Sequence, residues 1–207
     1  MALTQEQIDN LNKVLEIIKS QKITDPNTGE VKDRFTAEQA HIALWIANVE
    51  SRFDESALNT DTGASGIYQY KDDTWEGRCY NGYGQKWGYS KDDWEANKDD
   101  LNLQTKVFLE DFSGYITSMS WGGGTGALGT WSYDGLPGQT RAKDSMDNTG
   151  VPWTLENYIY LRHNTSLREE KKVILDRLLD LGGSFSDVEK AVETAYGKQI
   201  TDPYDNP

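Results

Sequence analysis

The sequence is poor in cysteine, in histidine and in long apolar runs. Cys79 is the only cysteine, so no disulfide can form within the chain, and neither a Cys-x-x-Cys pair nor a Cys/His zinc pattern occurs. The only histidines are His41 and His163, and no cluster of ligand residues accompanies them, so we expect no metal and no cofactor. No stretch reaches the roughly 18 consecutive apolar residues that a membrane-spanning helix needs, so no membrane span is expected.

Positive charge is also scarce. The chain has 21 Lys and Arg against 34 Asp and Glu, which gives a formal net charge of -13. A surface this acidic repels phosphate groups, so nucleic acid is not an expected partner. The opening residues, "MALTQEQIDN", contain neither a basic n-region nor an apolar h-region, so no Sec signal is expected.

Helical periodicity and capping signals predict a mainly helical chain. An amphipathic helix is predicted over 4–20, and a second helix over 36–50; each opens with a Thr followed three residues later by Gln, the capping-box pattern. The second helix is apolar nearly all round, which is typical of a buried helix. Further helices are predicted over 98–113, 154–163, 166–181 and 186–196, the last of which opens with another capping-box pattern, "SDVE".

The segments between these helices are rich in turn residues. "TDPNTGEVKD" is predicted to be a linker, 59–90 to hold loops and a short β-hairpin, and the glycine-rich 121–138 to form no regular element. The predicted fold class is mainly α, of the α+β kind. Three parts are expected: an N-terminal helix and linker (1–30), a central domain (31–165) and a C-terminal helical extension (166–207).

The second predicted helix ends in a carboxylate, Glu50, directly after "HIALWIANV". Burial disfavours the charged form of a carboxyl, and so does the negative end of the helix dipole. Both effects favour a carboxyl that stays protonated near neutral pH, as a general acid for glycoside cleavage requires. Position alone leaves a second interpretation open, a solvated Glu at the end of a helix.

The residues that follow Glu50 form a motif with fixed spacings, "ESRF…SALN…GASGIYQ", within 50–69. It resembles the signature of the soluble lytic transglycosylase family, in the lysozyme-like superfamily. Weaker resemblances extend to 102–112 and 158–166. The chain departs from the family pattern at Tyr68, where Met is usual, at His163-Asn164, where an aromatic-Asn pair is usual, and in the glycine-rich insertion. The residues that carry the main match are Glu50, Ser51, Phe53, Ala57, Asn59, Gly63, Ala64, Gly66, Ile67, Tyr68 and Gln69.

The resemblance implies a lysozyme-like catalytic domain over 31–165 that cleaves the β-1,4 bond between MurNAc and GlcNAc in the glycan strands of peptidoglycan. Glu50 would protonate the leaving oxygen and then act as base on the MurNAc C6 hydroxyl, which closes a 1,6-anhydro ring. This chemistry needs one carboxylate, because the nucleophile belongs to the substrate. The substrate-binding residues that the resemblance suggests are Ser51, Asn59, Ser65, Gly66, Tyr68, Gln69, Tyr160, His163 and Asn164.

Some of these residues have a structural interpretation as well. Gly66 would let the backbone approach the sugar or would simply form a tight turn. Gln69 would donate to a sugar or to Glu50, or would be a buried structural amide. Six aromatic residues are candidates either for stacking on sugar rings or for packing under their own loops. They are Trp75, Tyr80, Tyr83, Trp87, Tyr89 and Trp94.

Two other functions remain open. A muramidase on the same fold would use water and a second carboxylate. Asp61 is the best-placed candidate for that group, and it is also a residue typical of an Asx-turn in "NTDTG". Alternatively, the chain is a structural virion protein that keeps the fold and binds without cleaving. The other nearby carboxylates that a muramidase could use are Asp54, Glu55, Asp72 and Asp73.

The acidic surface bears on location, because cell walls are anionic and would repel a freely diffusing protein of this charge. A tethered enzyme needs no such attraction, since attachment sets its effective concentration. Together with the missing Sec signal, this favours a virion-associated phage protein that acts on the bacterial cell wall. Phage tail or capsid proteins are then expected partners, with the terminal helices either docking to them or packing onto the catalytic domain.

Overall fold

The computed structural model describes residues 2–80, 83–117, 120–121, 124–125, 147, 150–152, 154–163 and 171–200. Within them the chain is mainly helical, and its strands form small two-stranded antiparallel sheets. The helices are α1 (Gln5–Ser20), α2 (Ala37–Ser51), α3 (Asp72–Tyr80), α4 (Tyr83–Lys86), the 3-10 helix η1 (Lys91–Asp93), α5 (Leu101–Thr117), α7 (Leu155–His163) and α8 (Lys171–Tyr196). The strands are β1 (Lys22–Thr24), β2 (Val31–Asp33), β3 (Leu58–Asn59), β4 (Ala64–Ser65), β5 (Ser120–Trp121) and β6 (Gly124–Thr125).

The first two helices begin where the capping boxes predicted. The backbone N–H of Gln7 donates to Thr4 Oγ1 at 3.3 Å, and Thr4 N–H donates back to Gln7 Oε1 at 2.9 Å. Thr36 and Gln39 make the same reciprocal pair, at 3.3 and 3.0 Å. Each box satisfies two backbone donors that a helix start otherwise leaves without partners. The mainly helical class and both of these helices are therefore confirmed.

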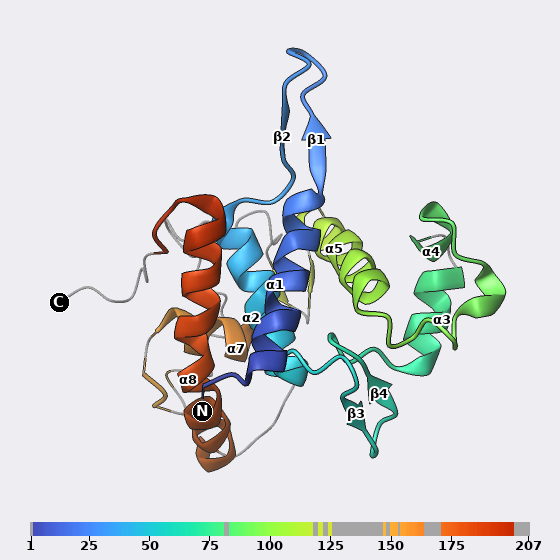
Figure 1. Ribbon diagram of the computed structural model, residues 1–207. Helices are drawn as coiled ribbons and strands as arrows, with labels where there is room; N and C mark the ends of the chain where they lie inside the picture. Colours follow the sequence, from blue (N-terminus) through green and yellow to red (C-terminus); the bar gives the residue numbers. More distant parts are fainter. Residues whose placement is uncertain are drawn as a thin grey trace.

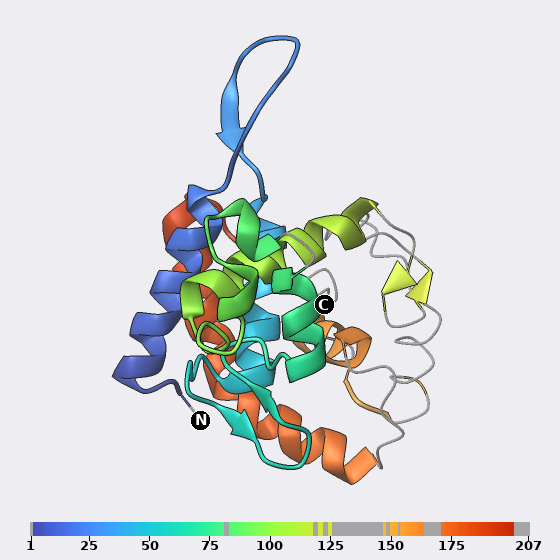
Figure 2. The same cartoon turned by 90° about the vertical axis from the view of Figure 1, so that its right-hand side faces the viewer.

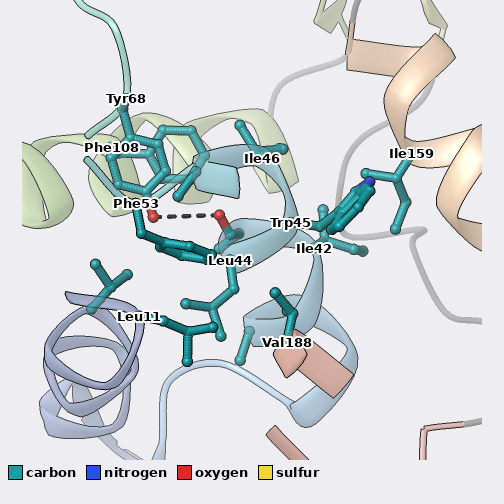
Figure 3. Close-up of a cluster of buried hydrophobic side chains, with 14 of the residues drawn as sticks. Leu11, Ile42, Leu44, Trp45, Ile46, Phe53, Tyr68, Phe108, Ile159 and Val188 are labelled. Atoms are coloured by element: carbon teal, nitrogen blue, oxygen red, sulfur yellow. Dashed lines mark hydrogen bonds between the residues drawn. The ribbon is translucent and has the colours of Figure 1, made fainter. Parts of the chain in front are cut away.

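Helix α2 is the centre of the core, as its apolar surface predicted. Every residue from 40 to 48 is buried, and Leu44 and Trp45 are completely so. Helices α1, α7 and α8 all pack against it. Figure 3 shows how side chains from four other helices, Leu11 of α1, Phe108 of α5, Ile159 of α7 and Val188 of α8, surround those of α2. A helix with no solvent-facing side is fixed by its packing, not by its own propensity.

The segment predicted as a linker forms the turn and the second strand of a β-hairpin instead. Strands β1 and β2 pair with Lys22 opposite Asp33, and the turn between them is closed by the Asp25 N–H donating to Glu30 O at 2.8 Å. The hairpin projects from the end of α1 away from the helical body (Figure 1). Its apolar residues are exposed, Val31 to 64%, so the hairpin has no buried face and the sequence shows no alternating pattern.

The two C-terminal helices predicted over 166–181 and 186–196 are one continuous helix from 171 onward; 164–170 lie outside the described residues. The "SDVE" pattern, which suggested a helix start, lies inside α8. Ser184 explains the continuity: its hydroxyl donates to Leu181 O at 2.6 Å and accepts from Asn48 Nδ2 at 2.9 Å. Packing onto α2 thus keeps α8 helical at Gly182 and Gly183, although glycine on its own favours a helix end.

The remaining expectations divide between confirmed and missed elements. The hairpin predicted within 59–90 is β3–β4, but α3 and α4 in the same segment were not predicted. The helices predicted over 98–113 and 154–163 are α5 and α7. The glycine-rich 121–138 was predicted to hold no regular element; that is wrong at its start, which forms part of the β5–β6 hairpin, and most of the rest is not described. None of the described helices is long and apolar enough to cross a membrane.

One cluster of buried residues draws on all three segments expected from sequence. Leu11 from the first segment, Phe108 from the second and Val188 from the third belong to one cluster of buried residues. Figure 2 shows α1, α2 and α8 running together through the body of the molecule. The terminal helices therefore pack onto the central segment, as one of the two interpretations proposed.

Burial of His41 predicts a pH-dependent stability. The ring is fully buried on α2, 5.1 Å from the ring of Phe185, and burial lowers the His41 pKa to about 3 although the charge of Glu38 opposes the shift. In the unfolded chain the pKa is near the ordinary value of about 6.5. Between these values the unfolded state binds more protons, so stability is lost as the pH falls below about 6.5.

We expect His41 alone to make the free energy of unfolding about 2 kcal/mol smaller at pH 5 than at pH 7. The test is urea unfolding at both pH values for the wild type and for His41→Gln, which cannot titrate there. Because each protein is compared with itself, the general effect of the substitution cancels. The same pH difference in both proteins would contradict this account.

Candidate active site

Glu50 lies in a cleft of about 710 Å³. The lining comes from the end of α2, from the β3–β4 hairpin with the turn after it, and from one face of α8, together with Tyr160 of α7. Figure 2 shows the β3–β4 hairpin and the first turns of α8 at the same end of the molecule, away from the projecting β1–β2 hairpin. Glu50 is half-buried there, at the end of the central helix.

The end of α2 is fixed by two successive residues with left-handed backbone conformation, Arg52 (φ 55°) and Phe53 (φ 61°). Such angles are strained for side chains with a Cβ, at about 1–2 kcal/mol each. Complete burial of the Phe53 ring offsets the strain, and Asn10 Nδ2 of α1 donates to Phe53 O at 3.0 Å. The helix therefore stops directly after Glu50 and Ser51, so the position of Glu50 is set by the core.

The loop after α2 is held by Gln104, a fully buried residue of α5. Gln104 Oε1 accepts from Tyr68 N–H at 2.9 Å, while Nε2 donates to Ser65 O at 3.0 Å and to Lys98 O at 2.6 Å. Gly66 (φ 77°) lies directly against this amide, and a Cβ there would overlap Gln104 Nε2. Of the two interpretations of Gly66, the contact supports the structural one: the missing Cβ makes room for the Gln104 amide.

One side chain joins this loop to the end of α2, and a second closes the loop on itself. Ser51 Oγ, next to Glu50, lies 2.9 Å from Ile67 O and 3.2 Å from Ala47 O, so its hydroxyl links α2 to the loop. Gln69 (φ 51°) lines the cleft, and its Nε2 donates to Ala57 O and to Gly66 O, both at 3.0 Å. These amide hydrogens are therefore used within the loop. The loop is a rigid neighbour of the carboxyl.

The structure brings four of the suggested substrate-binding residues to the cleft. Ser51, Asn59, Gln69 and Tyr160 line it together with Glu50. The side chain of Asn59 also closes its own turn, because Oδ1 accepts from the N–H groups of residues 61 and 62 at 3.1 and 3.2 Å. Tyr160 is buried, at 2% exposure, and reaches the cleft from α7.

Three others are not part of the described lining. Ser65 is buried, and its hydroxyl donates to Asp99 Oδ1 at 2.5 Å; Gly66 is buried against Gln104. Tyr68 stacks on Phe108 with ring centroids 3.9 Å apart, and burial raises its pKa above the usual value (Figure 3). Gly66 and Tyr68 thus pack against buried residues of α5, and Ser65 bonds Asp99 instead of lining the cleft.

The second carboxylate and the last two suggested residues remain to be placed. Asp61 is exposed and is not among the described residues of the cleft; its backbone N–H belongs to the Asn59 turn, the alternative interpretation from sequence. His163 is the last residue of α7, and Asn164 lies outside the described residues. Within the described chain no group of three or more His, Cys, Asp or Glu side chains could hold a metal ion.

Sequence reasoning missed four charged residues of the cleft: Arg52, Lys71, Arg177 and Asp180. Arg52 Nη1 lies 3.2 Å from Asp180 Oδ2, and this ion pair joins the end of α2 to α8. Arg52 and Asp180 are far apart in the sequence, so no local pattern could pair them. Arg52 itself lies inside the "ESRF" motif, at the position that the family signature leaves variable.

The described aromatic side chains of the aromatic-rich segment pack inward, and the side chain of Tyr80 lies outside the described residues. Trp75 is fully buried, and its Nε1–H donates to Trp94 O at 2.8 Å. Tyr83, Trp87, Tyr89 and Trp94 are partly buried against the core. In the described part of this segment no aromatic side chain lines the cleft.

The contact between Gly66 and Gln104 predicts different outcomes for two glycines of the same loop. Gly63 (φ 71°) has open space around a built Cβ, so Gly63→Ala should lower the free energy of unfolding by about 1–2 kcal/mol through backbone strain alone. Gly66→Ala should lower it by about 1–3 kcal/mol more, because the Cβ must also displace Gln104. Urea unfolding of both variants measures the difference.

A double variant separates strain from overlap. If the overlap is real, Gly66→Ala/Gln104→Ala should be less destabilised than the sum of its two single variants. Equal losses for Gly63→Ala and Gly66→Ala, with additive behaviour in the double variant, would show that Gln104 does not constrain Gly66.

Comparison of the chain with protein-family models, with curated proteins and with solved structures finds no match.

Proposed function

We propose that this chain is a peptidoglycan lytic transglycosylase with a lysozyme-like fold, and that Glu50 is its single catalytic acid and base. One observation carries the proposal. The carboxyl that the sequence motif singles out is half-buried in a cleft of about 710 Å³, at the end of a helix that the core encloses. The motif loop folds beside it and is held in place by Gln104.

In the proposed reaction, the protonated Glu50 carboxyl donates its proton to the glycosidic oxygen as the bond from MurNAc C1 breaks. The resulting carboxylate then takes the proton of the MurNAc C6 hydroxyl, whose oxygen attacks C1 and closes the 1,6-anhydro ring. The proton count returns to its starting value and no water is consumed. Ser51 contributes by holding the loop against the end of α2, because its hydroxyl lies 2.9 Å from Ile67 O. Gln69 contributes by closing the loop on itself, since its amide donates to Ala57 O and Gly66 O.

The muramidase remains the second candidate, because Asp180 supplies another carboxylate among the described cleft residues. That carboxylate already forms an ion pair with Arg52, and Asp61 is outside the described lining. Among the described lining residues, Asp180 is the carboxylate that a hydrolase could use beside Glu50 to activate water. The transglycosylase needs only Glu50, so the present arrangement favours it.

We also propose that the protein reaches the cell wall as part of a phage virion, held by tail or capsid proteins. The support is the net charge of -13, which opposes free diffusion to an anionic wall. Tethering removes the need for electrostatic attraction, because it fixes the local concentration.

Replacing the carboxyl tests the proposal. Glu50→Gln should reduce cleavage of purified sacculi on the order of 10²–10⁴-fold, because the amide can neither donate nor accept the proton. Glu55→Gln is the matched control: it removes a carboxylate from the same segment, outside the described cleft residues, and should leave the rate unchanged. Circular dichroism of both variants checks that they fold.

Mass spectrometry of the products separates the candidates. The wild type should release fragments that end in 1,6-anhydro-MurNAc. Reducing ends without the anhydro group would identify a muramidase. Wall clearing that is the same with and without the Glu50 carboxyl would rule out both enzymes and favour the structural virion protein.

A further inference from the structure

The cleft differs in charge from the chain as a whole. Its described lining contains three cationic side chains, Arg52, Lys71 and Arg177, and two carboxylates, Glu50 and Asp180, in a chain whose net charge is -13. Neutral sugar rings do not require cations. A small excess of cations in one cleft of an acidic protein favours a ligand that carries negative charge at that place.

The backbone places Lys71 on the cleft face of the hairpin. Residue 59 pairs with residue 64 in the β3–β4 ladder, and the bridge between residues 65 and 70 extends the ladder, which puts Lys71 opposite Ala64. Paired residues of a sheet point to the same side. Asn59, Ala64 and Lys71 accordingly all line the cleft.

The nearest carboxylate does not neutralise Lys71. Asp72 follows it directly, but Asp72 forms an ion pair with Lys98, which also donates to Gly63 O at 2.8 Å. Lys71 is exposed, and among the described residues its ammonium group has no ion pair and no hydrogen bond. By contrast, Arg52 on the other side of the cleft is held by Asp180. Among the described lining residues, Lys71 is thus the cation whose charge is available to a ligand.

We propose that Lys71 binds a carboxylate of the peptide stems that MurNAc residues carry, so that the cleft prefers peptide-bearing glycan strands to bare ones. The inference rests on the proposed function, whose substrate has both parts: a neutral sugar backbone and stem peptides that end in carboxylates. The sugar chain lies along the cleft at Glu50, and the stem leaves it on the side of the β3–β4 hairpin. Lys71 is a specificity residue in this arrangement and takes no part in proton transfer.

Binding measured in a Glu50→Gln background tests this inference without cleavage. The ligands are soluble glycan strands with their stem peptides and the same strands after an amidase has removed the peptides. Lys71→Gln should weaken binding of the peptide-bearing strands about fivefold at low salt, the size expected for an exposed ion pair. It should leave binding of the bare strands unchanged. Lys32→Gln, which removes an exposed lysine from the projecting β1–β2 hairpin, is the charge-matched control and should change neither.

Each other outcome overturns the inference. Equal weakening for both strands would mean that Lys71 contacts sugar, and no weakening would mean that it contacts nothing. The same loss in Lys32→Gln would reduce the effect to overall charge. Failure of the inference is distinguishable from failure of the proposed function, because Glu50-dependent release of 1,6-anhydro products by the wild type is measured separately. If the strands bind neither Glu50→Gln nor Glu50→Gln/Lys71→Gln, and the wild type forms no product, the inference and the proposed function both fail.

Discussion

The burial of α2 on all sides is the constraint on which the rest of the structure depends. Its side chains contact helices from both ends of the chain, so the helix has no freedom to rotate or shift. The end of this helix carries Glu50, and the left-handed residues that stop it are anchored by the buried Phe53 ring. The position of an ionisable group beside solvent is thus decided by apolar packing deep in the molecule.

The second constraint is the amide of Gln104, because it converts a flexible, glycine-containing loop into a fixed wall of the cleft. One side chain accepts from the Tyr68 N–H and donates to the carbonyl groups of Ser65 and Lys98, so it holds three backbone groups of the loop at once. Gly66 makes room for it, and Ser51 connects the same loop to α2. The central helix α2, the loop that follows it and α5 therefore form one hydrogen-bonded unit around Glu50.

How much could be predicted depended on whether the physical cause was local. Capping boxes at Thr4 and Thr36 and the apolar surface of α2 are local signals, and the structure confirms them. The "SDVE" pattern was misleading because a tertiary hydrogen bond between Asn48 and Ser184 keeps α8 continuous. The β1–β2 hairpin was missed since its strands bury nothing.

The same distinction applies to the cleft. Glu50, Ser51, Asn59 and Gln69 could be found because they lie in one short motif. Asp180 and Arg177 could not, since only the packing of α8 on α2 brings them there. Ser65, Gly66 and Tyr68 belong to the motif but are not among the described lining of the cleft: Gly66 and Tyr68 pack against α5, and Ser65 bonds Asp99. A motif specifies a loop conformation as much as it specifies a ligand, and sequence alone does not tell these roles apart.

The contribution of α8 to both core and cleft limits how the chain can be shortened. Removing 171–200 would take away the face that carries Arg177, Asp180 and Leu181, and it would also uncover His41 and Trp45, on which Phe185 packs. A fragment trimmed to the motif and its neighbours would therefore lack one wall of the cleft and would expose an apolar surface that promotes aggregation. Engineering of this protein, for example fusion to another module, is better done at the tip of the β1–β2 hairpin, where an insertion disturbs no buried side chain.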